Sequence, residues 1–214
     1  DVLDRFAMPY VPKNRNALFR MYSSVVRSIE ENFAKNSDAL LGVSDKIFLT
    51  FRKKPSRCVT IMNCCTDRMT NKSRVETNRF KLLFSSHIRQ GRGLESLMKI
   101  ITDLKDSELI IAGRVRDENL HEKITEIPNI RYVGLVLPDR LLELELSSDA
   151  LVALYDLNLQ PIHKFGMANK ILEAMMCGLP VITNIAIEIV KETESGIIVE
   201  YDDEEQLKEA IVSL

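Results

Sequence analysis

The chain has 214 residues and a formal net charge of −2, with 45% hydrophobic and 28% charged residues. This balance is typical of a globular protein and excludes a disordered tail or a collagen-like fibre. No apolar run approaches the roughly 20 residues of a spanning helix, which excludes a bitopic membrane protein. Residues 1–79 hold 15 Lys and Arg against 8 Asp and Glu, whereas residues 80–214 hold 14 against 23. The net charge therefore changes sign between the two parts, which indicates two units with different surroundings or a chance distribution of surface charges.

The four cysteines argue against a disulfide scaffold or a structural zinc site. Cys58, Cys64, Cys65 and Cys177 form no CxxC pair, and no two histidines stand at metal-ligand spacing. Reduced thiols in a cytoplasmic protein fit this pattern best. Because the first residue is Asp1 rather than Met, we expect the chain to be a fragment or a processed product.

The first unit is predicted to run helix, strand, helix, strand. Apolar residues at helical spacing predict an amphipathic helix over 16–35, and short apolar runs predict strands at 39–43 and 58–62 with a helix at 46–53 between them. A unit of this size is too small to bury a core alone and needs a partner. The polar stretch 66–79 lacks periodicity and is interpreted as a linker, so we divide the chain into domains 1–75 and 76–214.

The second domain is predicted to alternate strands and helices regularly. Strands are expected at 80–85, 108–112, 130–133, 150–154, 180–183 and 196–199. Helices are expected at 94–104, 117–125, 139–146, 169–177, 185–192 and 203–213. The strand runs are continuously apolar, as expected when helices cover both faces of a parallel sheet. Six such units predict an α/β, doubly wound Rossmann-like domain whose ligands lie beyond the carboxyl ends of the strands.

A glycine-rich turn follows the first strand of this domain. Residues 91–96 (Gly-Arg-Gly-Leu-Glu-Ser) nearly match GxGxxG, but the third glycine is replaced by Ser96 and five residues separate the strand from Gly91. Both departures disfavour nicotinamide binding. Free backbone N–H groups at a helix N-terminus still favour an anion, and Arg89 and Arg92 could bind it. The alternative is that both arginines simply face solvent.

A second candidate segment precedes and opens the helix at 169–177. Gly166 would allow close backbone approach, Asn169 is a candidate N-cap, and Lys170 in the first turn opposes the helix dipole unless an anion is bound. Glu173 lies among apolar neighbours, where a carboxylate needs partners such as sugar hydroxyls. The alternative is an i,i+3 ion pair between Lys170 and Glu173 on a solvated face.

Several segments in fixed order resemble the GT-B-fold, family-4-type ("group 1") glycosyltransferases. Residues 171–182 (ILEAMMCGLPVI) resemble the LEAMACGLPVI segment of that family, and residues 86–94 resemble its phosphate segment GRLxxxKG(L/V). Residues 109–113, 132–134 and 148–150 are similar to its LxIxG, YxG and (A/S)DA segments. Residues 38–44 and 59–63 resemble the tail of its N-terminal domain, so the chain would be the C-terminal, donor-binding half of GT-B plus the end of the other half.

The resemblance implies a role for each site residue. Glu173 would hold the ribose hydroxyls, while Arg92 and Lys170 would stabilise the departing diphosphate. These three residues would form the catalytic set. The residues implied in binding the nucleotide-sugar are His87, Arg89, Gly91, Gly93, Gly113, Gly134, Gly166, Met167, Ala168 and Asn169. Two departures stand out: His87 replaces the family's first phosphate arginine, and Phe165 replaces the acid expected eight residues before Glu173.

The implied function is a retaining glycosyltransferase of hexosyltransferase type. It would transfer a sugar from a nucleotide-diphosphate donor to a glycan or lipid-linked acceptor in polysaccharide biosynthesis, without metal or cofactor and without binding nucleic acid. The alternatives are a nucleotide-sugar-binding or regulatory module without transferase activity and a nucleotide-sugar epimerase on the same fold. The basic segment 51–57 favours peripheral contact with an anionic membrane at its cytoplasmic face, or else faces water or another domain.

Overall fold

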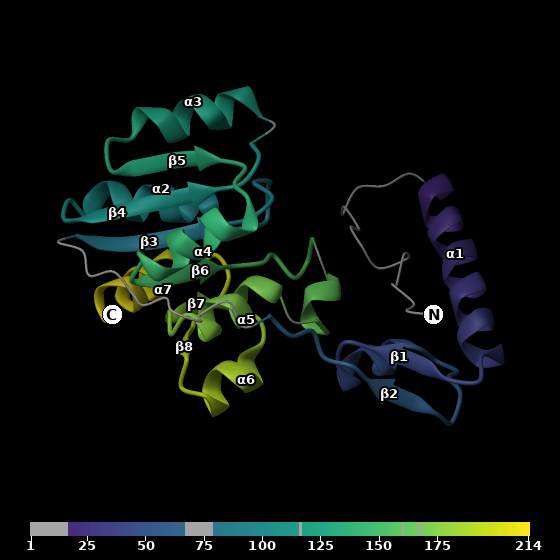
Figure 1. Ribbon diagram of the computed structural model, residues 1–214. Helices are drawn as coiled ribbons and strands as arrows, with labels where there is room; N and C mark the ends of the chain where they lie inside the picture. The colour runs from purple at the N-terminus through teal and green to yellow at the C-terminus, as the bar shows by residue number, and fades with distance from the viewer. Residues whose placement is uncertain (1–16, 67–78, 116, 160, 167) are drawn as a thin grey trace. The chain divides into compact units, whose positions relative to one another are not determined.

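The computed structural model describes residues 17–66, 79–115, 117–159, 161–166 and 168–214 (Figure 1). The chain divides into two compact units, one of residues up to 64 together with 156–168, the other of 65–155 and 169–214. The predicted domain boundary between residues 75 and 76 lies outside the described residues, as does most of the predicted linker. None of the helices in the described ranges is both long and apolar enough to cross a membrane.

The first unit has the predicted order of elements. It contains α1 (Ala17–Asn36), β1 (Leu40–Gly42), the 3₁₀ helix η1 (Asp45–Thr50) and β2 (Cys58–Thr60). The two strands pair in parallel, and a small core is formed by Ala34, Leu40, Phe48 and Phe51. Along α1 the side chains of Met21, Val25, Ile29 and Phe33 are each more than half exposed.

The second helix of this unit is shorter and tighter than predicted. The sequence predicted a helix over 46–53, whereas η1 ends at Thr50 with a bond from Phe51 N–H to the Phe48 carbonyl. The backbone N–H groups of Arg52 and Lys53 instead donate to the Glu31 carboxylate at 3.0 and 3.3 Å. A side chain from α1 therefore binds the donors that would have continued the helix.

The second unit is a six-stranded parallel sheet in the order β5-β4-β3-β6-β7-β8, which confirms the predicted fold class. The strands are β3 (Phe80–Ser85), β4 (Ser107–Ala112), β5 (Ile130–Gly134), β6 (Ala150–Ala153), β7 (Val181–Thr183) and β8 (Gly196–Ile198). The helices are α2 (Leu94–Asp103), α3 (Glu118–Glu126), α4 (Pro138–Leu146), α5 (Asn169–Met176), α6 (Ile187–Glu192) and α7 (Glu204–Val212). The strand order reverses between β3 and β6, where a doubly wound sheet opens its ligand crevice.

Helices cover both faces of this sheet, as the continuously apolar strands predicted. Figure 1 shows α4 and α5 in front of the sheet, with α2 and α7 behind it. Every residue of β6 is buried, and α2 presents one apolar face, including Leu97 and Ile101, to the core. Each such buried Leu or Ile contributes about 1.5–3 kcal/mol.

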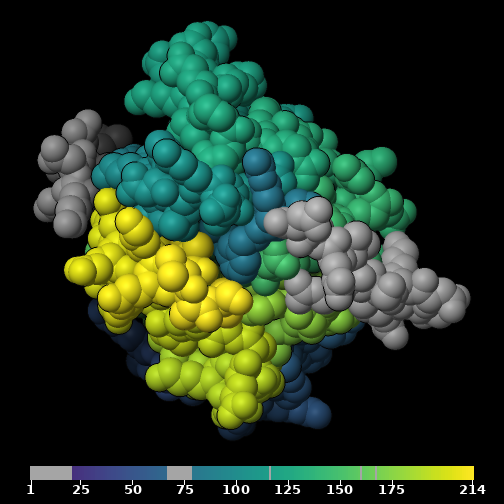
Figure 2. Space-filling view, turned by 90° about the vertical axis from the view of Figure 1, so that its left-hand side faces the viewer, coloured from purple at the N-terminus to yellow at the C-terminus, as the bar shows by residue number. Residues whose placement is uncertain are grey.

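Helices α2 and α7 lie side by side, as the adjacent teal and yellow surfaces of Figure 2 show. Two ion pairs join them, Lys99 Nζ to Glu204 Oε1 at 2.7 Å and Lys208 Nζ to Asp103 Oδ2 at 3.5 Å. Both pairs are exposed, so solvent and salt screen them and they contribute little to stability. Asp203 is the N-cap of α7, because its Oδ1 accepts from Gln206 N–H at 2.9 Å.

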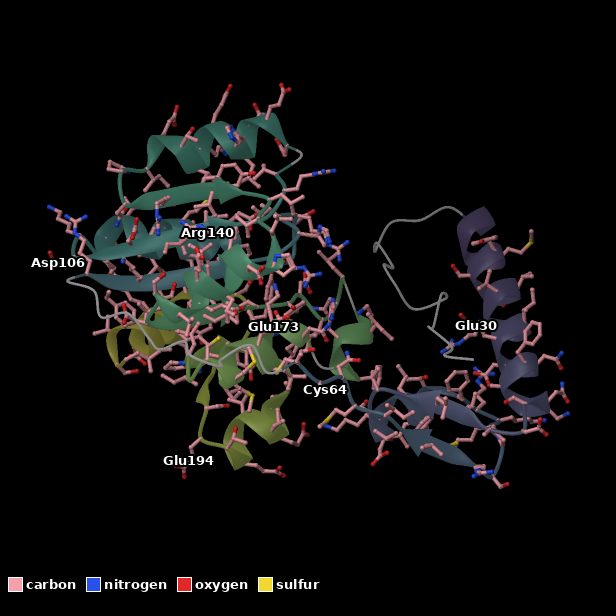
Figure 3. The ribbon with its side chains drawn as sticks, viewed as in Figure 1. Glu30, Cys64, Asp106, Arg140, Glu173 and Glu194 are labelled. Carbon is pink, nitrogen blue, oxygen red and sulfur yellow. The ribbon has the colours of Figure 1, made fainter. Side chains whose placement is uncertain are left out.

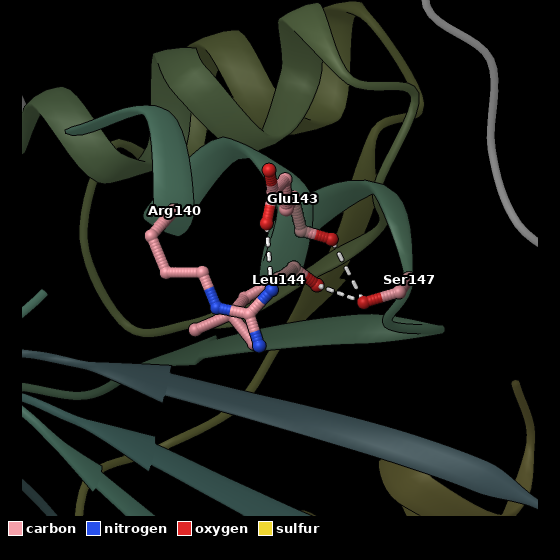
Figure 4. Close-up of polar contacts among 4 residues, drawn as sticks. All are labelled: Arg140, Glu143, Leu144 and Ser147. Atoms are coloured by element: carbon pink, nitrogen blue, oxygen red, sulfur yellow. Dashed lines mark hydrogen bonds and ion pairs between the residues drawn. The ribbon is translucent and has the colours of Figure 1, made fainter. Parts of the chain in front are cut away.

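Helix α4 is closed at its carboxyl end by local side-chain bonds (Figure 4). Ser147 Oγ donates to the carbonyls of Glu143 and Leu144 at 2.8 and 3.3 Å, and Arg140 pairs with Glu143 at 2.6 Å. The Arg140–Glu143 pair is exposed and three residues apart, so it contributes a few tenths of a kcal/mol. These contacts lie on the solvent side of α4, opposite Leu142, which packs into the unit.

Candidate functional site

The first part of the site is the turn that carries the chain from β3 into α2. Gly91 and Gly93 have φ angles of +81° and +73°, and Gly93 is the N-cap of α2. A Cβ at Gly93 would lie 2.9 Å from the Leu154 side chain, so only glycine fits both the conformation and the space. The predicted glycine-rich turn is therefore present, and the N-terminus of α2 opens at the carboxyl edge of the sheet, whereas anion binding by this turn stays a prediction.

Arg92 lies between these two glycines and turns inward. Only 7% of it is exposed, and its guanidinium lies 4.2 Å from the ring centroid of Tyr155. Among the described residues, its Nε finds no hydrogen-bond partner. Burial lowers the pKa of Arg92. The interaction with Tyr155 raises this pKa, and the charge of Arg89 lowers it further. The alternative of a solvent-facing arginine is thus wrong for Arg92, and a buried N–H donor is left for a ligand.

Lys170 reaches the same place from the first turn of α5. Its Nζ donates to the Ser85 carbonyl at the end of β3 and lies 5.9 Å from the Tyr155 ring centroid. Burial and the nearby Arg92 charge lower the pKa of Lys170 to about 7, although the Glu173 charge acts in the opposite direction. The bond to Ser85 replaces the alternative ion pair with Glu173. Two cations therefore converge where the strand order reverses.

Glu173, labelled in Figure 3, lies one turn further along α5 and lines a cavity of about 200 Å³. The other lining residues are Cys65, Thr66, Val136, Pro138, Leu141, Leu142, Glu145 and Met176. These residues combine apolar walls with a few polar groups. A carboxylate here can accept bonds from paired hydroxyls, as the sequence predicted for Glu173, although its role stays a prediction.

His87 and Arg89 lie at the same sheet edge but line another cavity, of about 840 Å³. Both side chains are exposed, and the wall is completed by Ile88, Gln90, Glu95, Arg114, Asp117, Leu120 and Leu135. Arg89 is near enough for its charge to lower the pKa of Arg92. The predicted phosphate residues are thus divided: Arg92 joins Lys170, whereas His87 lines the second cavity.

Gly113 directly follows strand β4, and Gly134 is the last residue of strand β5. Gly113 has a φ of +141°, and a Cβ there would come within 1.8 Å of the Ser86 carbonyl oxygen. The Gly113 N–H donates to the Gly134 carbonyl at 2.7 Å, and Tyr132 Oη donates to the Gly113 carbonyl at 3.0 Å. These bonds hold the loops of the edge together, and contact with a nucleotide stays a prediction for both glycines.

The segment before α5 is described only in part. Met167 lies outside the described residues, and Gly166 and Ala168 belong to the other compact unit. A Cβ at Gly166 would meet only an ordinary contact, 3.9 Å from the Ile162 carbonyl. Asn169, the predicted N-cap, is instead the first helical residue of α5, one position after the place of an N-cap. At the other end, Gly178 and Leu179 donate to the Met175 and Ala174 carbonyls, confirming the predicted glycine stop.

Tyr155 and Ser85 are the site residues that the sequence reasoning missed. Tyr155 is 2% exposed, and burial raises its pKa while Arg92 and Arg89 lower it. Ser85 supplies the carbonyl for Lys170, and its own Oγ is buried without a partner in the described part of the chain. Each stands at or just after the end of a central strand, and that position was the available signal.

The cysteines and the candidate metal ligands form no further site in the described part of the chain. All four cysteines are free thiols, and burial together with Glu145 raises the pKa of Cys177 to about 12. Within the described ranges, no group of three or more His, Cys, Asp or Glu side chains could hold a metal ion. Donor binding without a metal stays a prediction.

The family model "Glycosyl transferases group 1" matches residues 79–214. The chain belongs to this family, as the motifs predicted. A search of curated proteins found no match.

Solved structures share the fold at low identity. Sucrose-phosphate synthase from Thermosynechococcus elongatus matches with a TM-score of 0.70 and 18% identity over 89% of this chain and 52% of its own. HepE from Anabaena, solved with UDP and glucose, matches with a TM-score of 0.71 and 16% identity, over 91% of this chain and 58% of its own. A glycosyltransferase from Rickettsia africae matches with a TM-score of 0.68 and 19% identity, over 95% of this chain and 58% of its own. The chain therefore shares the GT-B fold of these structures. It spans about half the length of each of these proteins.

Proposed function

We propose that this chain is the donor-binding half of a retaining glycosyltransferase of hexosyltransferase type. It transfers a sugar from a nucleotide-diphosphate sugar to a glycan or lipid-linked acceptor in polysaccharide biosynthesis. The observation that carries the proposal is the convergence of Arg92 and Lys170 on Tyr155, with the Arg92 Nε lacking a partner among the described residues. A diphosphate supplies the acceptor oxygens and the negative charge that this arrangement lacks.

In the proposed reaction, these cations act on the leaving group. As the sugar–phosphate bond breaks, negative charge grows on the departing diphosphate, and the guanidinium, the ammonium and the N-terminus of α2 stabilise it. Because the groups are held by the fold, little reorganisation is needed as the charge develops. UDP and glucose in the HepE complex support a nucleotide-diphosphate donor for the shared fold.

Product analysis with radiolabelled UDP- and GDP-sugars tests the proposal on the whole chain. We expect label to move to an added glycan or lipid-linked acceptor, and the anomeric configuration of the product by NMR to match that of the donor. Phe165 stands where the resemblance expects an acid, and this favours one second candidate, a binding module without transferase activity. Nucleotide binding without any product would favour that module. Absence of nucleotide binding would overturn both.

Glu173→Gln is expected to weaken a nucleoside diphosphate by about 1–3 kcal/mol, since the amide is a poorer acceptor for two ribose hydroxyls. Folding should change little, and calorimetry with UDP or GDP measures the effect. The 2′-deoxy nucleotide lacks one of these hydroxyls, so it should bind the unaltered chain more weakly than the ribonucleotide does. Glu143→Gln on the solvent side of α4 is the control. If Glu173→Gln lowers the unfolding temperature but leaves nucleotide affinity unchanged, Glu173 has a structural role instead.

The first unit is proposed to contact the cytoplasmic face of an anionic membrane. Arg52, Lys53, Lys54 and Arg57 are all exposed beside the buried Phe51. Each basic residue near such a surface contributes about 1 kcal/mol, so weak, salt-sensitive sedimentation with phosphatidylserine vesicles is expected. Lys53→Glu/Lys54→Glu should reduce it, whereas Lys123→Glu/Lys191→Glu in the second unit should have less effect. No sedimentation at low salt contradicts the proposal.

A further inference from the structure

The backbone of Tyr155 is held on both sides by one side chain. Asn184 Oδ1 accepts from Tyr155 N–H at 2.9 Å, and Asn184 Nδ2 donates to the Tyr155 carbonyl at 2.8 Å. The backbone pairing of β6 and β7 has its last pair at Ala153 and Thr183, so Asn184 extends the ladder with its amide group. Tyr155 is 2% exposed and Asn184 is 8% exposed. Buried bonds of this kind fix the backbone from which the tyrosine ring projects.

The ring held in this way faces two cations. The Arg92 guanidinium lies 4.2 Å from its centroid and Lys170 Nζ lies 5.9 Å from it. Without a ligand these charges repel, and this repulsion contributes to the low pKa of Lys170. The negative face of an aromatic ring attracts cations, so Tyr155 offsets part of the repulsion. In this position the Arg92 Nε has no hydrogen-bond partner among the described residues.

We propose that Asn184 and Tyr155 are positioning residues for the diphosphate site, Asn184 by fixing Tyr155 and Tyr155 by holding Arg92 with its Nε free. The inference rests on the proposed function, because a diphosphate is the ligand that Arg92 serves. Neither residue touches the reacting atoms in this scheme. They act through Arg92, so their replacement affects phosphate binding more than nucleoside binding.

The first experiment needs no ligand. The ring current of Tyr155 should displace the side-chain NMR resonances of Arg92, which are assigned by comparison with Arg92→Lys. We expect the displacement to persist in Tyr155→Phe, to disappear in Tyr155→Leu and to shrink in Asn184→Ala. Thr183→Val is the matched control, because Thr183 is also buried and its Oγ1 bonds across the same strands to the Ala153 carbonyl at 2.7 Å. It should leave the resonances in place.

The second experiment compares affinities by calorimetry for UDP with uridine and for GDP with guanosine, using the whole chain. Tyr155→Leu should weaken the diphosphate about tenfold more than its nucleoside, whereas Tyr155→Phe should restore most of the difference. Asn184→Ala should reproduce part of the loss. Thr183→Val should lower stability to a similar degree without changing the ratio of the two affinities, which separates positioning from folding.

The outcomes distinguish this inference from the proposed function. If the unaltered chain binds a diphosphate but Tyr155→Leu leaves both the affinity ratio and the Arg92 resonances unchanged, the positioning role is overturned. Unchanged resonances in Asn184→Ala alone remove Asn184 from the scheme. If the unaltered chain binds neither diphosphate, the proposed function is overturned, and the NMR experiment still decides whether Asn184 and Tyr155 place Arg92.

Discussion

Arg92→Ala is expected to weaken nucleoside diphosphate binding roughly 10- to 100-fold, which corresponds to the loss of a charge-assisted bond of about 1.5–3 kcal/mol. Arg92 is the buried cation at the N-terminus of α2, and its Nε lacks a partner in the described part of the chain. The free nucleoside has no phosphate for it to bind, so its affinity should change less than about twofold. Calorimetry with UDP and uridine, and with GDP and guanosine, measures both losses.

Two controls separate a phosphate contact from general damage. Arg140→Ala removes an exposed arginine whose partner is Glu143, and it should affect neither ligand. Arg92→Lys keeps the charge but loses the planar guanidinium that stacks on Tyr155, so its effect should be intermediate. Added salt should weaken the diphosphate complex and leave the nucleoside complex unchanged. Equal losses of both ligands in Arg92→Ala would remove Arg92 from the phosphate site.

The parallel sheet was predictable because its signal is local. Continuous apolar runs such as Leu109–Ala112 are buried on both faces, and every predicted strand of the second unit was found within about two residues of its predicted bounds. Glycine positions carried similar information, since Gly93 and Gly178 both adopt positive φ angles at helix ends. The 3₁₀ helix η1 differed because its end depends on Glu31, a residue about twenty positions away.

The site was predictable only in part, because its partners are distant in sequence. A motif can indicate that Arg92 and Lys170 bind phosphate, but it cannot indicate that both face Tyr155. The bond from Lys170 to Ser85 spans 85 positions, and the bonds between Tyr155 and Asn184 span 29. Such pairs are decided by which strand ends adjoin in the sheet. The strand order could therefore have drawn attention to Tyr155 before any motif did.

Binding of a nucleoside diphosphate is expected to take up a proton at Lys170 above pH 7. The pKa of Lys170 is lowered to about 7 by burial and by the charge of Arg92, so the free chain carries a largely neutral amine at pH 8. A bound diphosphate stabilises the ammonium and raises this pKa again. Because an amine with this pKa is about one-tenth protonated at pH 8, uptake should then approach about 0.9 proton per ligand, and affinity should fall as the pH rises above 7.

The same lowered pKa makes a prediction for the stability of the free chain. An unfolded lysine keeps its proton up to pH 10.5, whereas folded Lys170 loses it near pH 7. Between these values the unfolded state binds more protons, so Lys170 should make the free energy of unfolding rise with pH. Lys170→Met should remove this rise, and denaturant unfolding at several pH values measures it. Lys191→Met replaces an exposed lysine and should leave it in place.

Calorimetry in Hepes and in Tris gives the proton uptake, because the two buffers differ in ionisation enthalpy. The diphosphate's own titration is common to every variant, so the difference between the unaltered chain and Lys170→Met isolates the lysine. Lys170→Met should bind the diphosphate more weakly at pH 6, where the unaltered chain is cationic, and the two affinities should approach each other at pH 9. If the unaltered chain takes up no more protons than Lys170→Met, then Lys170 does not meet the diphosphate and its low pKa reflects burial alone.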